Sequence, residues 1–410
     1  MLKNRNFMVL LLARFISNFG DSLYGVGIVF LIYSMTGSTF YTGLALFFQS
    51  SMAIVQFFLS PLFNRVNMKK YLILTQLIQA ILLISIPLIK LFSNLSIWYV
   101  MIVVSLSSLI NQIVYPGQLA LLPRILNSEE EILKGNSLFM MAYQGSDAIF
   151  NSISGLIISL TSIYVAFYID SVTFLLNAAL FLLLTSIVAK PLIDEKFSFK
   201  ENLDSYFKDF KNGLSIWKNP TLLRFLVASM FINFAATFMF ASFPKYSSSE
   251  FEYSLYLSCM GLGTIIGISI ANTKFLRSLD LGKVFNFGII TIGIYWIFMA
   301  NLKLEILSFR IISIILYLLS WINAGVVSIY TQTMIQVNVD KSKIAVVMSS
   351  LYSLTVILSP IGSLLGGSFT EIIGAKSVVF ISGIIVLFVG ILILFNKNMR
   401  NLKNFNDLDL

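Results

Sequence analysis

Long apolar runs separated by short polar loops constrain this chain more than any other feature. The first run extends from about Phe7 to Tyr33, and similar runs recur as far as Phe395. A helix needs about 20 apolar residues to cross the hydrocarbon core of a bilayer. Inside a bilayer the backbone must satisfy its own hydrogen bonds, which an α-helix does within one segment. The pattern therefore predicts an all-α integral membrane protein.

The composition excludes other broad classes of protein. Only 11% of residues are charged and 57% are hydrophobic, whereas soluble domains carry about 25% charged residues. An ordinary soluble enzyme is therefore excluded, and we predict that the chain is not an enzyme. The net charge of +9 does not indicate a nucleic-acid partner, because the Lys and Arg residues lie between apolar runs instead of on one water-exposed face. With one cysteine and no histidine, we expect no internal disulfide, no metal site and no cofactor.

The apolar runs predict twelve transmembrane helices in two halves of six. The expected spans of the first half are 7–35, 41–63, 71–91, 97–121, 137–161 and 164–189. Those of the second half are 221–244, 253–273, 283–301, 307–334, 344–369 and 375–396. Two parallel halves of six helices are the layout of the major facilitator fold.

Four segments follow from this division. Residues 1–189 form an N-terminal six-helix bundle and residues 221–396 a C-terminal one. The linker 190–220 has an apolar face at helical spacing, which predicts an amphipathic helix on the inner membrane surface. Residues 397–410 form a polar tail.

The basic residues predict the orientation. If the N-terminus is cytoplasmic, 22 of the 28 Lys and Arg residues lie on the cytoplasmic side and five on the outer side, and Arg14 lies within a span. Cytoplasmic loops are enriched in Lys and Arg. The bias predicts that both termini and the linker are cytoplasmic.

Four charged residues stand well inside predicted spans: Arg14, Asp21, Asp147 and Asp170. Charged groups are costly in hydrocarbon, so they are functional candidates by default. Arg14 and Asp21 are seven residues apart and share one face of the first span, with Asn18 between them. At a helical rise of about 1.5 Å per residue, Asp147 lies at a depth between Arg14 and Asp21.

Two interpretations of these charges remain open. One aspartate accepts a proton in one state and releases it in another, with Arg14 as the modulating charge. Alternatively, Arg14 and one aspartate form a permanent pair that only joins two helices. Asp147 has no basic neighbour within a turn, which favours a functional role. Asp170 lies near the outer end of its span, where a cap or a packing contact is expected.

The loop between the second and third spans resembles a pattern of the major facilitators, G-x-x-x-D-R-x-G-R-K. Arg65 and the pair Lys69 and Lys70 match it, whereas Ser60, Asn64 and Asn67 replace its two glycines and its aspartate. The functional interpretation is a cytoplasmic gating loop formed by Asn64, Arg65, Lys69 and Lys70. The alternative is a loop that only supplies positive charge to the cytoplasmic side.

Five further segments resemble the drug:proton antiporter branch of the major facilitators that contains macrolide-efflux and enterobactin exporters. They are 115–137, 18–22, 169–174, 213–220 and 359–374. The resemblance covers nearly the whole chain and implies proton-driven export across a bacterial plasma membrane. Two patterns depart from the branch: Asn151–Gly155 keeps only the last glycine of G-P-x-x-G, and Lys343–Ala345 lacks the usual Gly-Arg pair.

The resemblance also implies that spans one, four, seven and ten line a central substrate cavity. The expected lining residues, most of them amides and aromatics that suit an amphipathic ligand, are Asn18, Tyr24, Asn111, Gln112, Tyr115, Asn233, Phe234, Trp321 and Asn323. Packing against lipid or other helices is the alternative for each aromatic residue.

The predicted function is secondary active export of amphipathic organic compounds by proton antiport. A drug, a siderophore-like metabolite or a small peptide fits as substrate, and we expect a monomer in the bilayer. The absence of a GxxxxGK[ST] motif argues against direct use of ATP. The alternatives are a lysophospholipid-type lipid flippase, a solute importer, and a membrane immunity protein or receptor that binds without transport.

Overall fold

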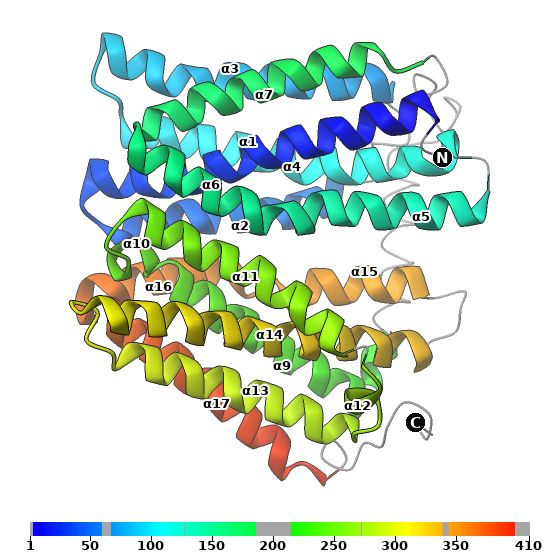
Figure 1. Ribbon diagram of the computed structural model, residues 1–410, viewed down its shortest axis with the longest axis vertical. Helices are drawn as coiled ribbons and strands as arrows, with labels where there is room; N and C mark the ends of the chain where they lie inside the picture. The colour runs from blue at the N-terminus through cyan, green and yellow to red at the C-terminus, as the bar shows by residue number, and fades with distance from the viewer. Residues whose placement is uncertain are drawn as a thin grey trace. The chain divides into compact units, whose positions relative to one another are not determined.

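The computed structural model describes residues 3–59, 67–126, 128–185, 215–271, 273–338 and 344–397 (Figure 1). The regular elements among these residues are all helices joined by short connections, and no strand occurs among them. Ten of the helices are long and apolar enough to cross a membrane. The chain is therefore a multi-pass membrane protein by length and composition, and the all-α prediction is confirmed for this part of the chain.

The chain divides into two compact units. The first consists of Met1–Gly37, Phe48–Ser205 and Ser247–Ser258, and the second of Ser38–Phe47, Tyr206–Tyr246 and Cys259–Leu410. Helices α2 (Thr39–Leu59) and α11 (Glu250–Ala271) thus contribute to both units. The boundaries predicted at residues 189 and 221 remain a prediction, because residues 186–214 lie outside the described ranges.

The first unit is built around α1. Its other helices are α3 (Met68–Phe92), α4 (Ile97–Ile125), α5 (Glu129–Met140), the π-helical turn η2 (Met141–Gly145), α6 (Ser146–Leu160) and α7 (Ile163–Leu182). Helix α1 (Arg5–Thr36) packs against α7, α6 and α4. It begins at Asn4, whose side chain accepts a hydrogen bond from the Phe7 amide, and it ends at Gly37, whose φ of 64° favours glycine.

The second unit is centred on two helix pairs. Helix α13 (Leu281–Ala300) packs on α17 (Ala375–Phe395), and α9 (Pro220–Phe240) packs on α16 (Ser359–Ile373). The remaining elements are η4 (Ser215–Lys218), α10 (Phe243–Tyr246), α12 (Lys274–Arg277), α14 (Leu307–Asn338) and α15 (Ile344–Thr355). Gly293 and Gly383 bring α13 and α17 close: a Cβ on Gly383 would lie 2.8 Å from the Gly293 carbonyl oxygen.

Three expected spans differ from the structure. Span 137–161 is not a uniform helix, because η2 interrupts it between α5 and α6. Span 344–369 is divided after Thr355, where Pro360 in the first turn of α16 marks a new helix start. Span 41–63 corresponds to α2, and its last residues lie outside the described ranges. The number twelve therefore remains a prediction.

Candidate functional site

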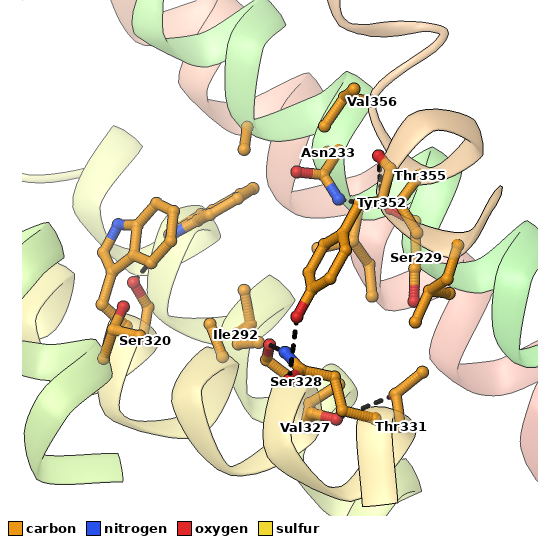
Figure 2. Close-up of a pocket in the computed structure, with 18 residues that line it drawn as sticks. Ser229, Asn233, Ile292, Ser320, Val327, Ser328, Thr331, Tyr352, Thr355 and Val356 are labelled. Atoms are coloured by element: carbon orange, nitrogen blue, oxygen red, sulfur yellow. Dashed lines mark hydrogen bonds between the residues drawn. The ribbon is translucent and has the colours of Figure 1, made fainter. Parts of the chain in front are cut away.

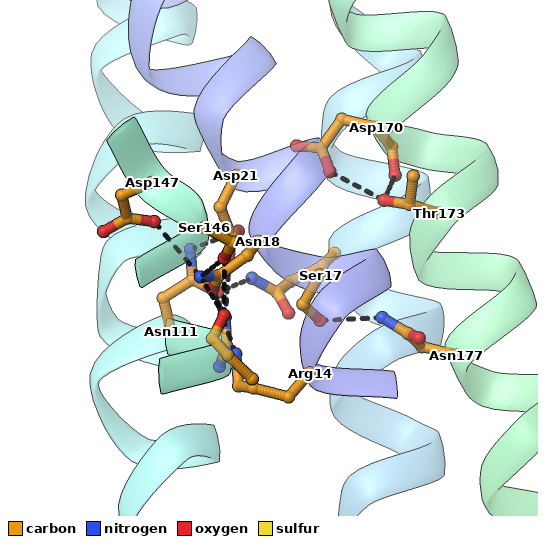
Figure 3. Close-up of polar contacts among 12 residues, drawn as sticks. Arg14, Ser17, Asn18, Asp21, Asn111, Ser146, Asp147, Asp170, Thr173 and Asn177 are labelled. Carbon is orange, nitrogen blue, oxygen red and sulfur yellow. Dashed lines mark hydrogen bonds and ion pairs between the residues drawn. The ribbon is translucent and has the colours of Figure 1, made fainter. Parts of the chain in front are cut away.

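A polar cluster in the first unit joins three of the four charges predicted within spans (Figure 3). Arg14 and Asp21, two turns apart on α1, form an ion pair with 3.0 Å between Nη2 and Oδ2. The Arg14 side chain is 5% exposed and the Asp21 side chain 26%, so the pair is buried at its basic end and half-buried at its acidic end. Arg14 also lies over the Tyr115 ring of α4, 5.6 Å from its centroid, within cation–π range.

Asn18 is the centre of this cluster. Its Oδ1 accepts hydrogen bonds from Arg14 Nε at 3.0 Å and from Nη2 at 2.6 Å. Among the described side chains and carbonyls, its Nδ2 has three acceptors, the Ala142 carbonyl at 2.8 Å, Ser146 Oγ at 2.9 Å and Asp147 Oδ1 at 3.1 Å. A carboxamide has two N–H groups, so these three acceptors compete for two hydrogens.

The π-helical turn supplies one of the three acceptors of Asn18, and the other two follow at the start of α6. Residues Met141–Gly145 form a wider turn directly before Ser146 and Asp147. Such turns are rare and occur frequently at functional sites. Here the Ala142 carbonyl accepts from both Asn18 Nδ2 and Ser146 Oγ. The interruption of span 137–161 therefore supplies part of the site.

The cluster continues away from α1 through side-chain amides. Asn111 of α4 donates from Nδ2 to Asp21 Oδ1 at 3.2 Å, and its own Oδ1 accepts from Gln79 Nε2 at 2.6 Å. Gln79 in turn accepts from Gln76 Nε2 at 3.2 Å, both on α3. The hydrogen bonds thus run from α3 through α4 and α1 to α6.

The charges of the cluster do not balance within it. It contains one guanidinium group and two carboxylates, and Asp21 takes the ion pair with Arg14. The hydrogen-bond donor to Asp147 in the described chain is the neutral amide of Asn18. Asp147 is half-buried, and a partly desolvated carboxylate without its own cation is costly. Asp147 is therefore the group in this cluster best suited to exchange a proton.

Asp170 lies apart from the cluster, on α7 across α1 (Figure 3). It is completely buried, and its Oδ1 accepts a hydrogen bond from Thr173 Oγ1 at 3.0 Å. The backbone of Gly20 approaches so closely that a Cβ there would lie 2.0 Å from Asp170 Oδ1. This contact fits the packing role that the sequence suggested for Asp170.

The residues of the first unit that were predicted to line a cavity lie in different surroundings. Asn111 and Tyr115 contact the charged cluster, and Gln112 is half-buried beside them on α4. Tyr24 is instead buried against Phe167 of α7 and is 4% exposed, so the structure does not place it on an open surface.

A separate pocket of about 300 Å³ lies in the second unit (Figure 2). Its lining includes Asn233 of α9 and Trp321 of α14, both predicted for a cavity. Two other predicted residues do not line it: Phe234 stacks on Phe238, and Asn323 donates to Thr291 Oγ1 of α13. Adjacent helical residues point in different directions, which separates Phe234 from Asn233.

The predicted gating loop is only partly visible. Asn64 and Arg65 lie outside the described ranges, and Lys70 is exposed. Lys69 Nζ donates to the carbonyls of Leu182 at 2.8 Å and Leu184 at 2.6 Å. These carbonyls lie at the end of α7, where a basic side chain stabilises a helix terminus.

Several site residues are absent from the sequence-based prediction. Gln76, Gln79 and Ser146 complete the polar cluster, and Tyr352 lines the pocket. Gln76 and Gln79 are polar residues within an apolar run. This pattern is a signal from which the sequence could have identified them. Ser146 and Tyr352 carry no comparable signal.

Comparisons with known proteins agree with this architecture. Residues 10–355 match the family model described as Major Facilitator Superfamily. An uncharacterized MFS-type transporter of Bacillus subtilis (strain 168), YvqJ, is 24% identical over 96% of this chain and 93% of its own length.

Solved structures of transporters share the fold at low sequence identity. The nucleoside transporter NupG is 14% identical, with a TM-score of 0.68, over 95% of this chain and 100% of its own. A POT family transporter in complex with a thioalcohol-conjugated peptide is 12% identical, with a TM-score of 0.73, over 97% of both chains. A bacterial homologue of the iron transporter ferroportin is 14% identical, with a TM-score of 0.70, over 97% of this chain and 99% of its own. The chain belongs to the Major Facilitator Superfamily, and it is a multi-pass membrane transporter and not an enzyme.

Proposed function

We propose that this transporter exports amphipathic organic compounds from the cytoplasm and that proton entry through the Asp147 cluster drives the export. The observation that carries the proposal is the charge imbalance around Asn18. Arg14 and Asp21 pair with each other, whereas Asp147 accepts a hydrogen bond from a neutral amide. Ionisable groups at membrane depth are typical of proton pathways in transporters.

Asn18 gives the cluster a way to transmit a change of charge. When Asp147 is ionised, a hydrogen bond from Asn18 Nδ2 to its carboxylate is strengthened, because charge-assisted hydrogen bonds are the stronger kind. When Asp147 takes up a proton, Ser146 Oγ and the Ala142 carbonyl compete better for the same N–H groups. Since Asn18 Oδ1 also holds Arg14, protonation of Asp147 alters the position of the Arg14–Asp21 pair.

The proposed direction of transport and the proposed drug:proton antiporter branch are both inferred from the sequence. The cytoplasmic enrichment of basic residues orients the chain, and the resemblance to macrolide-efflux and enterobactin exporters favours export by proton antiport. We propose that the substrate binds in the protein from the cytoplasmic side and leaves on the other side by alternating access. The lysophospholipid-type flippase, the importer and the immunity protein remain the competing functions.

Transport in inverted membrane vesicles tests the proposal. Vesicles from bacteria that express the chain are energised with lactate and incubated with radiolabelled chloramphenicol, radiolabelled erythromycin or the dye Hoechst 33342. Export from the cell corresponds to accumulation in the vesicles, and we expect at least one compound to accumulate and to be released by an uncoupler. Accumulation that persists with an uncoupler and requires ATP would contradict proton coupling, and uptake only into right-side-out vesicles would indicate an importer.

A further inference from the structure

The pocket of the second unit has no charged residue among its lining side chains in the described part of the chain. Its walls are aromatic, aliphatic, hydroxyl and amide groups contributed by α9, α11, α13, α14 and α15. The nearest basic residue along α9, Arg224, lines a different groove together with Phe388 of α17. The four charges within spans described above, by contrast, all belong to the first unit.

The polar groups of the pocket form neutral hydrogen bonds. Tyr352 Oη donates to Gln332 Oε1 at 3.2 Å, and Gln332 Nε2 donates to Ser328 Oγ at 3.2 Å (Figure 2). Asn233 donates from Nδ2 to the Ser229 carbonyl at 2.9 Å, which leaves its Oδ1 as an acceptor for a ligand. Tyr352 is 53% exposed, so this wall of the pocket is open to an entering molecule.

Two indole rings supply the apolar surface. Trp296 and Trp321 both line the pocket, and Trp296 is held by a hydrogen bond from its Nε1 to Ser320 Oγ at 3.0 Å. Fixed aromatic rings favour stacked or edge-to-face contact with another ring. The volume of about 300 Å³ is at the lower end of small-molecule sites, which suits one ring system with a polar substituent.

We infer that this pocket binds an uncharged, flat aromatic part of the substrate, one that carries a neutral hydrogen-bonding group such as an amide. A fixed charge in the pocket has no counter-ion there, and burial of an unpaired charge is costly. A neutral amide loses few hydrogen bonds when it leaves water for the pocket, because Asn233, Gln332 and Tyr352 offer it both donors and acceptors. The inference rests on the proposed function for its biological meaning, since it names the class of substrate that the exporter selects.

Equilibrium binding to the purified chain in lipid nanodiscs tests the inference with three probes that share one ring system. Indole-3-acetamide is neutral, tryptamine is a cation and indole-3-acetate is an anion at neutral pH. We expect the amide to bind at least about tenfold more tightly than either charged probe, because each of these brings an unpaired charge. Equal or tighter binding of a charged probe to the wild type, or failure of the amide to bind, overturns the inference.

Variants at Asn233 locate the binding. Asn233→Asp keeps the size of the side chain but adds a negative charge, and we expect it to shift the preference from the amide to tryptamine. Asn233→Leu removes the polar group and adds no charge. It should weaken binding of the amide and leave binding of tryptamine no tighter than in the wild type. Ala324→Phe fills the pocket and should abolish binding of the amide. If the aspartate variant does not fold, the other two variants decide the question. If neither of them changes the affinity for the amide, the amide binds elsewhere on the protein.

The binding assay uses no gradient, so the two proposals fail independently. Loss of the preference for the amide while uncoupler-sensitive accumulation persists removes only the inference about the pocket. Retention of the preference without any gradient-driven transport removes the proposed coupling and leaves the binding site.

Discussion

At the scale of single residues, the cluster around Asn18 shows which contacts the spacing of residues in the sequence can predict. The seven-residue separation of Arg14 and Asp21 is enough to put them on one face of α1, where the structure joins them in an ion pair. The estimate of depth brings Asp147 to the same level. Neither argument identifies Asn18 as the residue that contacts Arg14 and Asp147. Its position depends on the Ala142 carbonyl in the π-helical turn and on the Ser146 hydroxyl at the start of α6.

The Arg14–Asp21 pair gives a prediction about stability. Asp21→Asn leaves the buried Arg14 charge without its partner and should lower the free energy of unfolding by about 3 kcal/mol. Arg14→Gln leaves the half-buried Asp21 charge and should cost less. The double variant removes both charges and should recover most of this loss. Thermal unfolding of the four proteins in one detergent measures the coupling. If the double variant loses as much stability as the two single variants together, the two residues act separately.

At the scale of helices, interruptions are the features that hydropathy does not predict. The run 137–161 is apolar throughout most of its length, yet η2 changes its hydrogen bonding at the level of Asn18. The break between α15 and α16 lets Tyr352, Thr355 and Val356 line the pocket. Such breaks depend on local backbone geometry, so the positions of the spans could be predicted while their internal shape could not.

Close helix packing gives a second prediction. Gly383→Ala on α17 places a Cβ 2.8 Å from atoms of Gly293 and Ile297 on α13, and overpacking of this kind costs about 1–3 kcal/mol. The melting temperature should therefore fall. Gly25→Ala on α1 is the matched control, since its Cβ meets nothing within 4 Å. Equal melting temperatures for the two variants would mean that α13 and α17 separate without cost.

At the scale of the whole molecule, the two units differ in chemistry. The first unit contains Arg14, Asp21, Asp147 and Asp170 within its spans, and the second contains a pocket lined by uncharged side chains in the described chain. Composition and hydropathy are sufficient to predict a helical membrane protein, and the resemblance of its loop and helix segments to the major facilitators implies the family. They do not reveal the pocket, because its lining comes from five helices and from residues that are ordinary in any apolar span.

Orientation gives a prediction at the same scale. Single cysteines at the exposed residues Asn94 and Ser278, in a Cys259→Ser background, should react differently with a thiol reagent that does not cross membranes. The distribution of basic residues puts Asn94 outside and Ser278 in the cytoplasm. We expect Asn94→Cys to be labelled in intact cells and Ser278→Cys only after permeabilisation. The reverse pattern would invert the topology.

The central claim is that Asp147 couples proton entry to transport. Asp147→Asn keeps the size of the side chain and a hydrogen-bonding group but fixes a neutral form. Asp170→Asn is the control, because it changes another carboxylate within a span, one that is buried in a packing contact with Gly20.

The decisive measurement compares two modes of transport in proteoliposomes at equal protein content, with a compound that accumulates in the vesicle assay. We predict that Asp147→Asn retains exchange of labelled for unlabelled substrate without a gradient and loses accumulation driven by a proton gradient, whereas Asp170→Asn retains both. Gradient-driven accumulation by Asp147→Asn at the wild-type rate would contradict the account.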